Sequence, residues 1–221
     1  ATGSPGGINF ATFISEYFAD VASNGSFTFY GGLTTNTSFG PQNVTGEQIA
    51  FNYGSDTERL VLEGDGELAY DYMVSGSSFG HGISAKLDSL TFGQWADGVT
   101  QGTAGIGDAG LLTGLQEQLK ISGFDLESVP GSGHVAALNL VYALYNAAQN
   151  RNAAAINSAL SNYQQNFIGS EGNDTYTGGS FSDTITGGDG VDSLSGGGGD
   201  DRFVVGAGET GTGESYDGGD G

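Results

Sequence analysis

A nine-residue period occupies the last quarter of this 221-residue chain and constrains its fold more than any other feature. From Gly169 the pattern G-G-x-G-x-D-x-U-x, where U is a large apolar residue, occurs four times without a gap. The eighth position is taken in turn by Tyr176, Ile185, Leu194 and Phe203. This regular apolar phase is typical of a coil that stacks on its own repeats, and it argues against a disordered Gly/Asp linker.

Acidic residues recur at the sixth position of the period and are candidate cation ligands. Glycine permits the positive φ of a tight turn and lets carbonyl groups face an ion. Carboxylates combined with carbonyls suit Ca²⁺, a hard cation that takes about six to eight oxygen ligands. The candidate ligand residues are Asp174, Asp183, Asp192 and Asp201, with Gly169, Gly172, Gly178, Gly187, Gly190, Gly196 and Gly198 in the turns.

Two residues depart from the pattern. Ser170 stands in the second slot of its repeat, and Phe181 stands in the fourth slot of the next one, which argues against an ion in that turn. Glu171 and Asp189 occupy variable positions, where their carboxylates are candidate assisting ligands.

The four repeats resemble the repeats-in-toxin (RTX) family. The resemblance implies a parallel β-roll in which two nonapeptides make one coil, so that ions lie between turns 18 residues apart. This pairs Asp174 with Asp192 and Asp183 with Asp201. It also implies type I export, with folding on contact with external calcium and disorder without it.

The period is lost after Val205, and residues 218–221 look like the opening of a further repeat. We therefore expect residues 168–221 to form a truncated roll, and the chain to be part of something longer.

Charge and composition exclude several classes of function. Twenty-six acidic and five basic residues give a formal net charge of −21, which repels nucleic acid and anionic lipid. No run of about 18 apolar residues occurs, so membrane insertion is not expected. The chain has no cysteine, and its first seven residues lack a basic region followed by an apolar stretch. These features agree with type I export.

Residues 1–167 are predicted to form a globular α+β domain in which a curved antiparallel sheet packs on helices. A helical stripe from Phe10 to Val21 precedes the strands and ends at Asn24-Gly25. Alternating segments predict strands, and a helical hairpin follows them. The predicted strands are 48–52, 59–63, 67–74, 83–92 and 119–124, and the predicted helices are 134–148 and 153–163.

Several sequence words in this domain resemble the bacterial hemophores, secreted haem-acquisition proteins of the HasA type. The closest is KLDSLTFG at residues 86–93, supported by FISEYFADVAS at 13–23, GELAY at 66–70 and LVYAL at 140–144. The resemblance covers most of residues 8–165 and implies a hemophore-like fold, haem binding and, independently of the repeats, type I export.

The hemophore resemblance also implies a haem site. In that family the iron lies between a Tyr at the end of a strand and a His on a preceding loop, with a second His holding the phenolate. Here Tyr70 takes the strand position, His81 takes the supporting position, and Tyr72 is the reserve ligand. The segment from Asn24 to Val44, where the axial His is expected, contains no His, and Tyr30 lies nearest the vacant position.

Catalysis has no credible set of residues. GSSFG at residues 76–80 matches the G-x-S-x-G nucleophile pattern but joins two predicted strands, whereas that motif needs a strand followed by a helix. With two histidines in the chain, no H-E-x-x-H helix is present. A non-enzymatic protein is expected.

The sequence thus predicts a secreted, extracellular protein that binds haem and calcium. Its further partners would be an outer-membrane receptor or neighbouring copies at the cell surface. The alternative is a structural or adhesive module of a larger calcium-dependent protein, in which haem binding has been lost.

Overall fold

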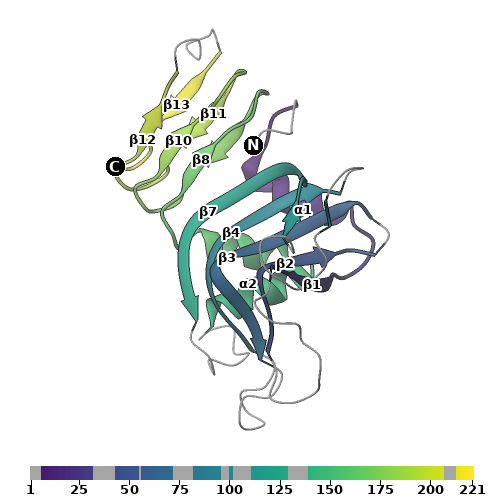
Figure 1. Cartoon of the computed structure of the whole chain (residues 1–221). Coiled ribbons are helices and arrows are strands. Elements are labelled where there is room, and N and C mark those ends of the chain that lie inside the picture. Colours follow the sequence, from purple (N-terminus) through teal and green to yellow (C-terminus); the bar gives the residue numbers. More distant parts are fainter. Residues whose placement is uncertain are drawn as a thin grey trace.

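A globular domain and a narrow stack of short strands make up the chain. The computed structural model describes residues 6–31, 43–54, 56–71, 82–95, 100–101, 111–128, 139–206 and 213–221. Figure 1 shows a curved sheet backed by helices, with the short strands beyond its end. The predicted α+β class, followed by a parallel β-roll, is confirmed.

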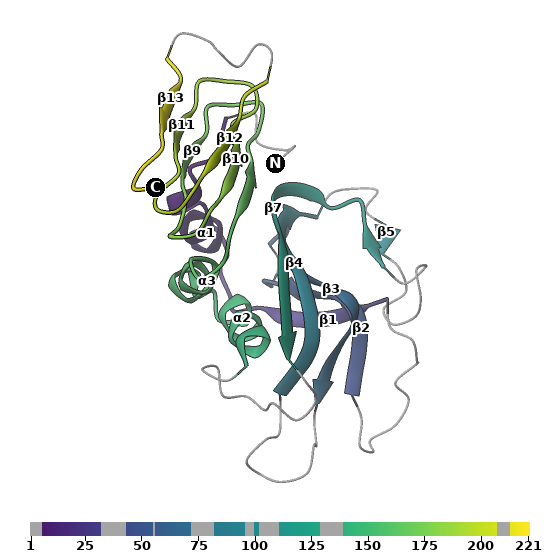
Figure 2. The same cartoon turned by 90° about the vertical axis from the view of Figure 1, so that its left-hand side faces the viewer.

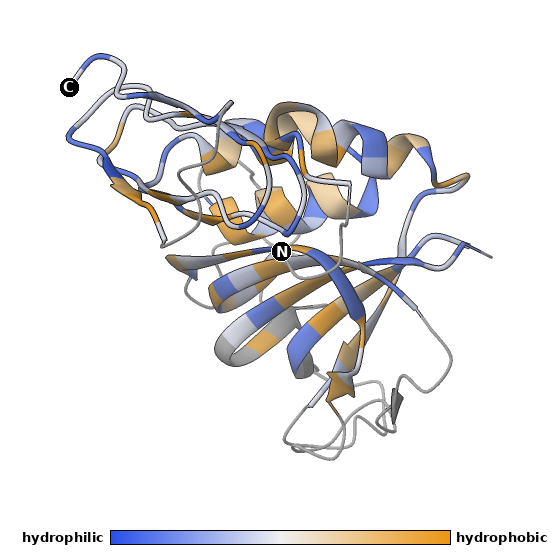
Figure 3. Cartoon of the chain, turned by 90° about the horizontal axis from the view of Figure 1, so that it is seen from above, coloured by the Kyte–Doolittle hydropathy of each residue, from blue (hydrophilic) through white to orange (hydrophobic). Residues whose placement is uncertain are grey.

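Five antiparallel strands form the main sheet, in the order β1-β2-β3-β4-β7. Along β4 buried Leu87 lies between exposed Lys86 and Asp88, the alternation expected of a strand with one face on a core. Figure 3 shows similar hydrophobic and hydrophilic bands along the strands. The strands are β1 (Ser26–Tyr30), β2 (Asn43–Asn52), β3 (Glu58–Asp71), β4 (Gly82–Gln94) and β7 (Gln116–Ser128), with β5 (Thr100–Gln101) and β6 (Leu112–Thr113) paired separately.

Two strand predictions need correction. Residues 59–63 and 67–74 were expected as separate strands, but β3 continues through Gly64 to Asp71 with shifts of register. The segment from Asn24 to Val44 was expected as a loop, but it begins with β1, which pairs with β2. In β1 the hydrogen-bonded partner strand decides the local structure, whereas β3 passes its glycines through an irregularity of the ladder.

Three helices cover one face of the sheet (Figure 2). They are α1 (Phe10–Ala19), α2 (Leu140–Gln149) and α3 (Ala153–Leu160). Each begins after an asparagine whose side-chain oxygen accepts a backbone N–H of the first turn: Asn9, Asn139 and Asn152. The start predicted at residue 134 lies outside the described residues. None of the helices described is long and apolar enough to cross a membrane.

The core of the domain lies between this helical layer and the sheet. Phe92 of β4 is fully buried, with its ring 5.1 Å from that of Tyr17 and 5.7 Å from that of Phe13. The Tyr17 hydroxyl donates to the Gly93 carbonyl at 3.1 Å. Burial raises the pKa of Tyr17, so this hydroxyl stays protonated and remains a donor.

The remaining strands form the roll as two parallel three-stranded sheets, β8-β10-β12 and β9-β11-β13. Successive strands of one sheet are 18 residues apart up to Val204, which is one coil of two nonapeptides. The predicted boundary after residue 167 falls within β8. The strands are β8 (Asn166–Ile168), β9 (Thr175–Thr177), β10 (Thr184–Thr186), β11 (Ser193–Ser195), β12 (Arg202–Val204) and β13 (Ser215–Asp217).

The interior of the roll is small and is filled by the predicted apolar position. Tyr176, Ile185 and Leu194 are each at most 2% exposed, and Phe167 of β8 stacks on Tyr176 at 4.3 Å between ring centroids. Burial decreases toward the C-terminal end, where Tyr216 of β13 is 40% exposed.

Candidate calcium site at the turn edges of the roll

The sixth-position carboxylates lie inside the turns of the roll. Asp174, Asp183 and Asp192 are only 1–2% exposed. A buried carboxylate is costly unless hydrogen-bond donors or a cation compensate it. The contacts of these three residues, and of Asp201 beyond them, therefore decide what the turns can bind.

On one turn edge, each carboxylate accepts a backbone N–H from the coil below. The Asp174 N–H donates to Asp192 Oδ1 at 2.9 Å, and the Asp192 N–H donates to Glu214 Oε2 at 3.0 Å. At the lower end, the Ile8 N–H donates to Asp174 Oδ1. These four residues, Ile8, Asp174, Asp192 and Glu214, are here called the first ladder.

The other turn edge repeats this arrangement half a coil away. The Asp183 N–H donates to Asp201 Oδ1 at 2.8 Å, and the Gln165 N–H donates to Asp183 Oδ1 at 2.7 Å. Gln165, Asp183 and Asp201 are here called the second ladder. The structure thus brings together the two predicted pairs, Asp174 with Asp192 and Asp183 with Asp201.

Backbone carbonyls lie beside the carboxylates because the glycines of the turns allow close approach. A Cβ atom on Gly178 would collide with the Gly196 carbonyl oxygen and with Asp183 Oδ2. Gly197, with φ of +90°, lies against the Gly179 carbonyl, 2.5 Å from where its own Cβ would be. The other predicted glycines make similar backbone contacts between coils: Gly169, Gly172, Gly187, Gly190, Gly196 and Gly198.

These oxygen atoms fit calcium. Asp201 Oδ2 and Glu214 Oε1 are buried and have no hydrogen-bond partner, which marks them as acceptors that await a cation or a donor. In the described part of the chain, no group of three or more His, Cys, Asp or Glu side chains lies together as a metal site. An ion here would therefore combine ladder carboxylates with turn carbonyls, which are the ligands that Ca²⁺ prefers.

The two candidate assisting ligands belong to neither ladder. Glu171 and Asp189 are exposed. Phe181 is 45% exposed, and Asp183 in the same repeat still accepts the Gly179 N–H at 2.8 Å. The Phe181 substitution therefore leaves the second ladder intact.

Four ladder contacts were missed at the sequence level. Ile8 and Gln165 contribute only backbone N–H groups, and such groups carry no residue-type signal. Ser170, 5% exposed, donates through both its N–H and its hydroxyl to Asp174. Glu214 could have been found, because it precedes Tyr216 by two residues, the same spacing that separates Asp192 from Leu194.

Of the predicted haem ligands, the structure describes Tyr70 and Tyr30. Tyr70 is the penultimate residue of β3, and its Cα pairs with Val44 of β2 and Ile83 of β4. Tyr72 and His81 lie outside the described residues. Asp71, next to Tyr70, pairs with Gly82, which follows His81 in the sequence.

Tyr30 belongs to β1 and pairs with Gln48. Its half-buried side chain lines a hollow of about 340 Å³ with Thr28, Ala50, Asn52, Arg59, Trp95 and Leu112. Burial raises the pKa of Tyr30, although the nearby Arg59 charge opposes the shift. Since iron binds a tyrosine as phenolate, this surrounding disfavours the ligand form of Tyr30.

Comparison with known protein families confirms the predicted nonapeptide repeats. Residues 168–208 match the RTX calcium-binding nonapeptide repeat family in four copies, so this segment is an array of RTX repeats. No curated protein sequence matches the chain.

Two solved structures resemble the chain over 70% of its length, each with a TM-score of 0.46. One is an apo structure of the hemophore HasA from Yersinia pestis, at 18% identity over 81% of that chain. The other is a mutant HasA monomer from Yersinia pseudotuberculosis, at 16% identity over 82% of that chain. At these identities and scores, neither likeness assigns a role to a residue of this chain.

Proposed function

We propose that the roll binds calcium between successive coils and that the protein works outside the cell. The observation that carries this proposal is the pair of ladders, in which buried carboxylates stack coil upon coil beside carbonyl groups and end in unpartnered oxygens at Asp201 and Glu214. Calcium would join adjacent coils through oxygen ligands alone.

The charge of the chain supports a cation-dependent fold. A formal charge of −21 opposes compaction through self-repulsion, and divalent ions bound within the roll would offset part of it. Binding free energy of this kind contributes directly to folding when the site exists only in the folded state. Export by the type I route, with folding on meeting external calcium, is consistent with this behaviour.

Calcium titration followed by far-UV circular dichroism tests the proposal. Asp192→Asn keeps the hydrogen-bonding shape of the first ladder but removes a charge, so we expect weaker calcium binding and a smaller gain of β signal. Asp189→Asn makes the same chemical change on an exposed residue of the same turn and is the matched control. Equal titration curves for wild type and Asp192→Asn would contradict the proposal.

We also propose that the globular domain binds haem through Tyr70. The register of β3 with β4 supports this, since it places Tyr70 at the end of the hairpin that leads to His81. A phenol, with an ordinary pKa near ~10, binds ferric iron as phenolate when the metal and a hydrogen-bonded base favour that form. The His81 imidazole would supply the base, with Tyr72 as the substitute ligand.

A haemin titration followed by absorbance tests haem binding. We expect a saturable one-to-one spectrum with a phenolate charge-transfer band, lost in Tyr70→Phe and altered in His81→Ala. Tyr163→Phe, on the far side of the domain after α3, is the control and should bind as wild type. If the spectrum is unchanged in Tyr70→Phe, a residue other than Tyr70 binds the iron, which contradicts the proposal.

The alternative is a structural or adhesive module of a larger calcium-dependent protein. The absence of His between Asn24 and Val44 favours it. No specific haemin spectrum, together with an intact calcium response, would select this alternative.

A further inference from the structure

The lower end of the roll is closed by the globular domain in the way that one coil closes the next. Thr175 N–H donates to the Ile8 carbonyl at 2.7 Å, just as Ser193 N–H donates to the Asp174 carbonyl at 2.8 Å one coil later. Asn9 and Thr175 form a parallel β-bridge. Residues 6–9 therefore take the place of a preceding coil on the first ladder.

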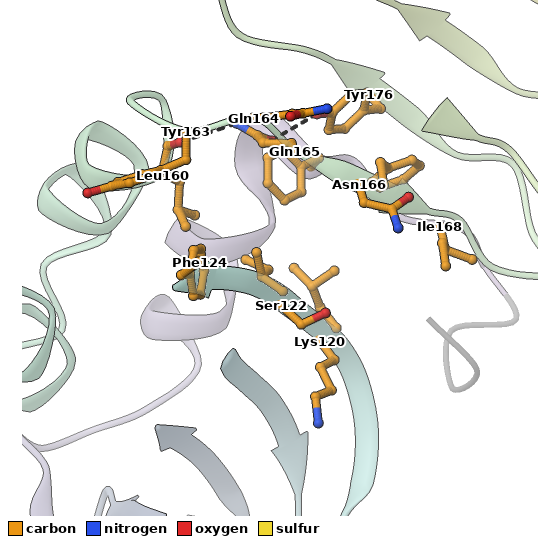
Figure 4. Close-up of a pocket in the computed structure, with 14 residues that line it drawn as sticks. Lys120, Ser122, Phe124, Leu160, Tyr163, Gln164, Gln165, Asn166, Ile168 and Tyr176 are labelled. Atoms are coloured by element: carbon orange, nitrogen blue, oxygen red, sulfur yellow. Dashed lines mark hydrogen bonds between the residues drawn. The ribbon is translucent and has the colours of Figure 1, made fainter. Parts of the chain in front are cut away.

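Gln165 closes the second ladder in the same way. Its carbonyl accepts the Thr184 N–H at 2.9 Å, and its own N–H donates to Asp183. The side chain is anchored on both sides, since it accepts the Tyr176 hydroxyl at 2.8 Å and donates to the Leu160 carbonyl at 3.4 Å (Figure 4).

Apolar packing fixes these two closing segments against the roll. Phe10, directly after Asn9, lies 5.2 Å from the ring of Tyr176 and 6.0 Å from that of Phe167. The crevice beside them, shown in Figure 4, has a volume of only 20 Å³, room for about one water. The first coil thus packs directly on the domain.

Asp174, at this lower end, is saturated by protein donors. Its Oδ1 accepts the Ile8 N–H, its Oδ2 accepts the Ser170 N–H, and the Ser170 hydroxyl lies 3.0 Å and 3.2 Å from the two oxygens. The corresponding residue in the next three repeats is glycine, which has no hydroxyl. At the opposite end, Asp201 Oδ2 is buried without a partner.

We propose that residues 6–9 and Gln165 form a calcium-independent seed for the roll, in which Ser170 supplies to Asp174 the compensation that calcium supplies to later carboxylates. This inference rests on calcium binding by the roll. Since each coil of a solenoid is stabilised by its neighbour, calcium removal unfolds the roll from its C-terminal end and leaves the seeded strands β9 and β10 in place.

Hydrogen exchange of the full chain measures the stability of each coil separately, because each coil has its own hydrogen-bonded backbone amides. In wild-type protein with EGTA, the Thr175 amide stays protected while the Ser193 and Arg202 amides exchange freely; calcium protects all three. Thr175 exchanging as fast as Arg202 in EGTA would overturn the seed.

Ser170→Gly restores the glycine of the other repeats and removes the hydroxyl donor to Asp174. In EGTA we expect the Thr175 amide to exchange at least about tenfold faster than in wild type, as follows from the loss of a hydrogen bond to a charged group, and calcium should restore its protection. Ser180→Gly makes the same change at an exposed position and should behave as wild type. Unchanged β4 amides show that the domain remains folded.

The outcomes separate the two proposals. A roll that responds to calcium, but in which Ser170→Gly leaves Thr175 unaffected, overturns the seed alone. A roll in which no amide responds to calcium overturns the proposed calcium binding as well.

Discussion

The globular domain and the roll are stabilised in different ways. The domain joins five strands and three helices around one extensive apolar core in which Phe92 and Leu62 are completely buried. The buried core of the roll consists of Phe167, Tyr176, Ile185 and Leu194, with the partly buried Phe10 and Phe203 packed against it, and buried carboxylates lie in the turns beside it. We therefore expect the domain to fold without an ion, whereas the roll combines a small core with buried negative charge.

The contrast predicts that calcium acts on the roll and not on the domain. Hydrophobic burial scales with apolar area, so the domain keeps its stability without metal. The carboxylates of the roll lose their compensation when the cation leaves.

Calcium removal should have the largest effect and should be confined to the roll. At a calcium concentration a hundred times the dissociation constant, each bound ion changes the folding equilibrium about a hundredfold. In EGTA we expect rapid proteolysis after residue 187 and unchanged fluorescence of Trp95, the single tryptophan. Mass spectrometry of the fragments checks this, and cleavage patterns that are identical in calcium and EGTA would break the contrast.

Phe92→Ala should destabilise the domain whether or not calcium is present. Removing a fully buried phenylalanine leaves a cavity and costs about 3–5 kcal/mol. Urea unfolding followed by Trp95 fluorescence should show the same decrease in the free energy of unfolding in calcium and in EGTA. A loss seen only in calcium would mean that the domain depends on the roll.

Leu194→Ala should act on the roll alone. Leu194 is 2% exposed in the small core, and its truncation should cost about 2–3 kcal/mol. We expect the calcium midpoint for the β signal to rise while the urea midpoint of Trp95 stays the same. Val191→Ala, in the same repeat but 44% exposed, is the control and should leave both midpoints unchanged.

The smallest effect is expected at the Lys120–Glu63 ion pair on the sheet, with 2.8 Å between Nζ and Oε2. Burial would raise the pKa of Glu63, but hydrogen bonds from Lys120, Gln48 and Ser89 lower it overall. Burial would lower the pKa of Lys120, but Glu63 raises it overall.

The pair therefore contributes fully to the stability of the fold at pH values above the ordinary Glu pKa of about 4.3 and below the ordinary Lys pKa of about 10.4. This contribution is lost as pH falls through the lowered Glu63 value or rises through the raised Lys120 value. Lys120→Met should cost at most about 1 kcal/mol at pH 7 and reduce the fall of Tm on acidification. An unchanged acid slope would show that the pair contributes nothing.

Much of the roll could be predicted from the sequence because its pattern is local. The eighth-position residues Tyr176, Ile185 and Leu194 are buried as expected, and the sixth-position aspartates form the ladders. In the domain, the helical stripe was also reliable, since Ile14, Tyr17 and Phe18 of α1 face the core.

Other features depend on contacts between distant segments and could not be predicted. Ile8 lies 166 residues before its partner Asp174, and only its backbone N–H takes part. Gly64 and Gly66 suggested a turn, yet β3 continues through them, with its pairing to β4 shifted in register between Gly64 and Ala69. Glu214 departs from the regular spacing, since it lies 22 residues from Asp192 instead of 18, and only its position two residues before Tyr216 indicates its place in the ladder.

The most direct test of the calcium roll is an experimental structure of the calcium-loaded protein. We expect ions between successive coils, bound by ladder carboxylates such as Asp183 or Asp201 and by turn carbonyls, at about 2.3–2.6 Å from each oxygen. Ions absent from the coils, or held only by the exposed Glu171 and Asp189, would contradict the assignment of the ladders as the calcium site.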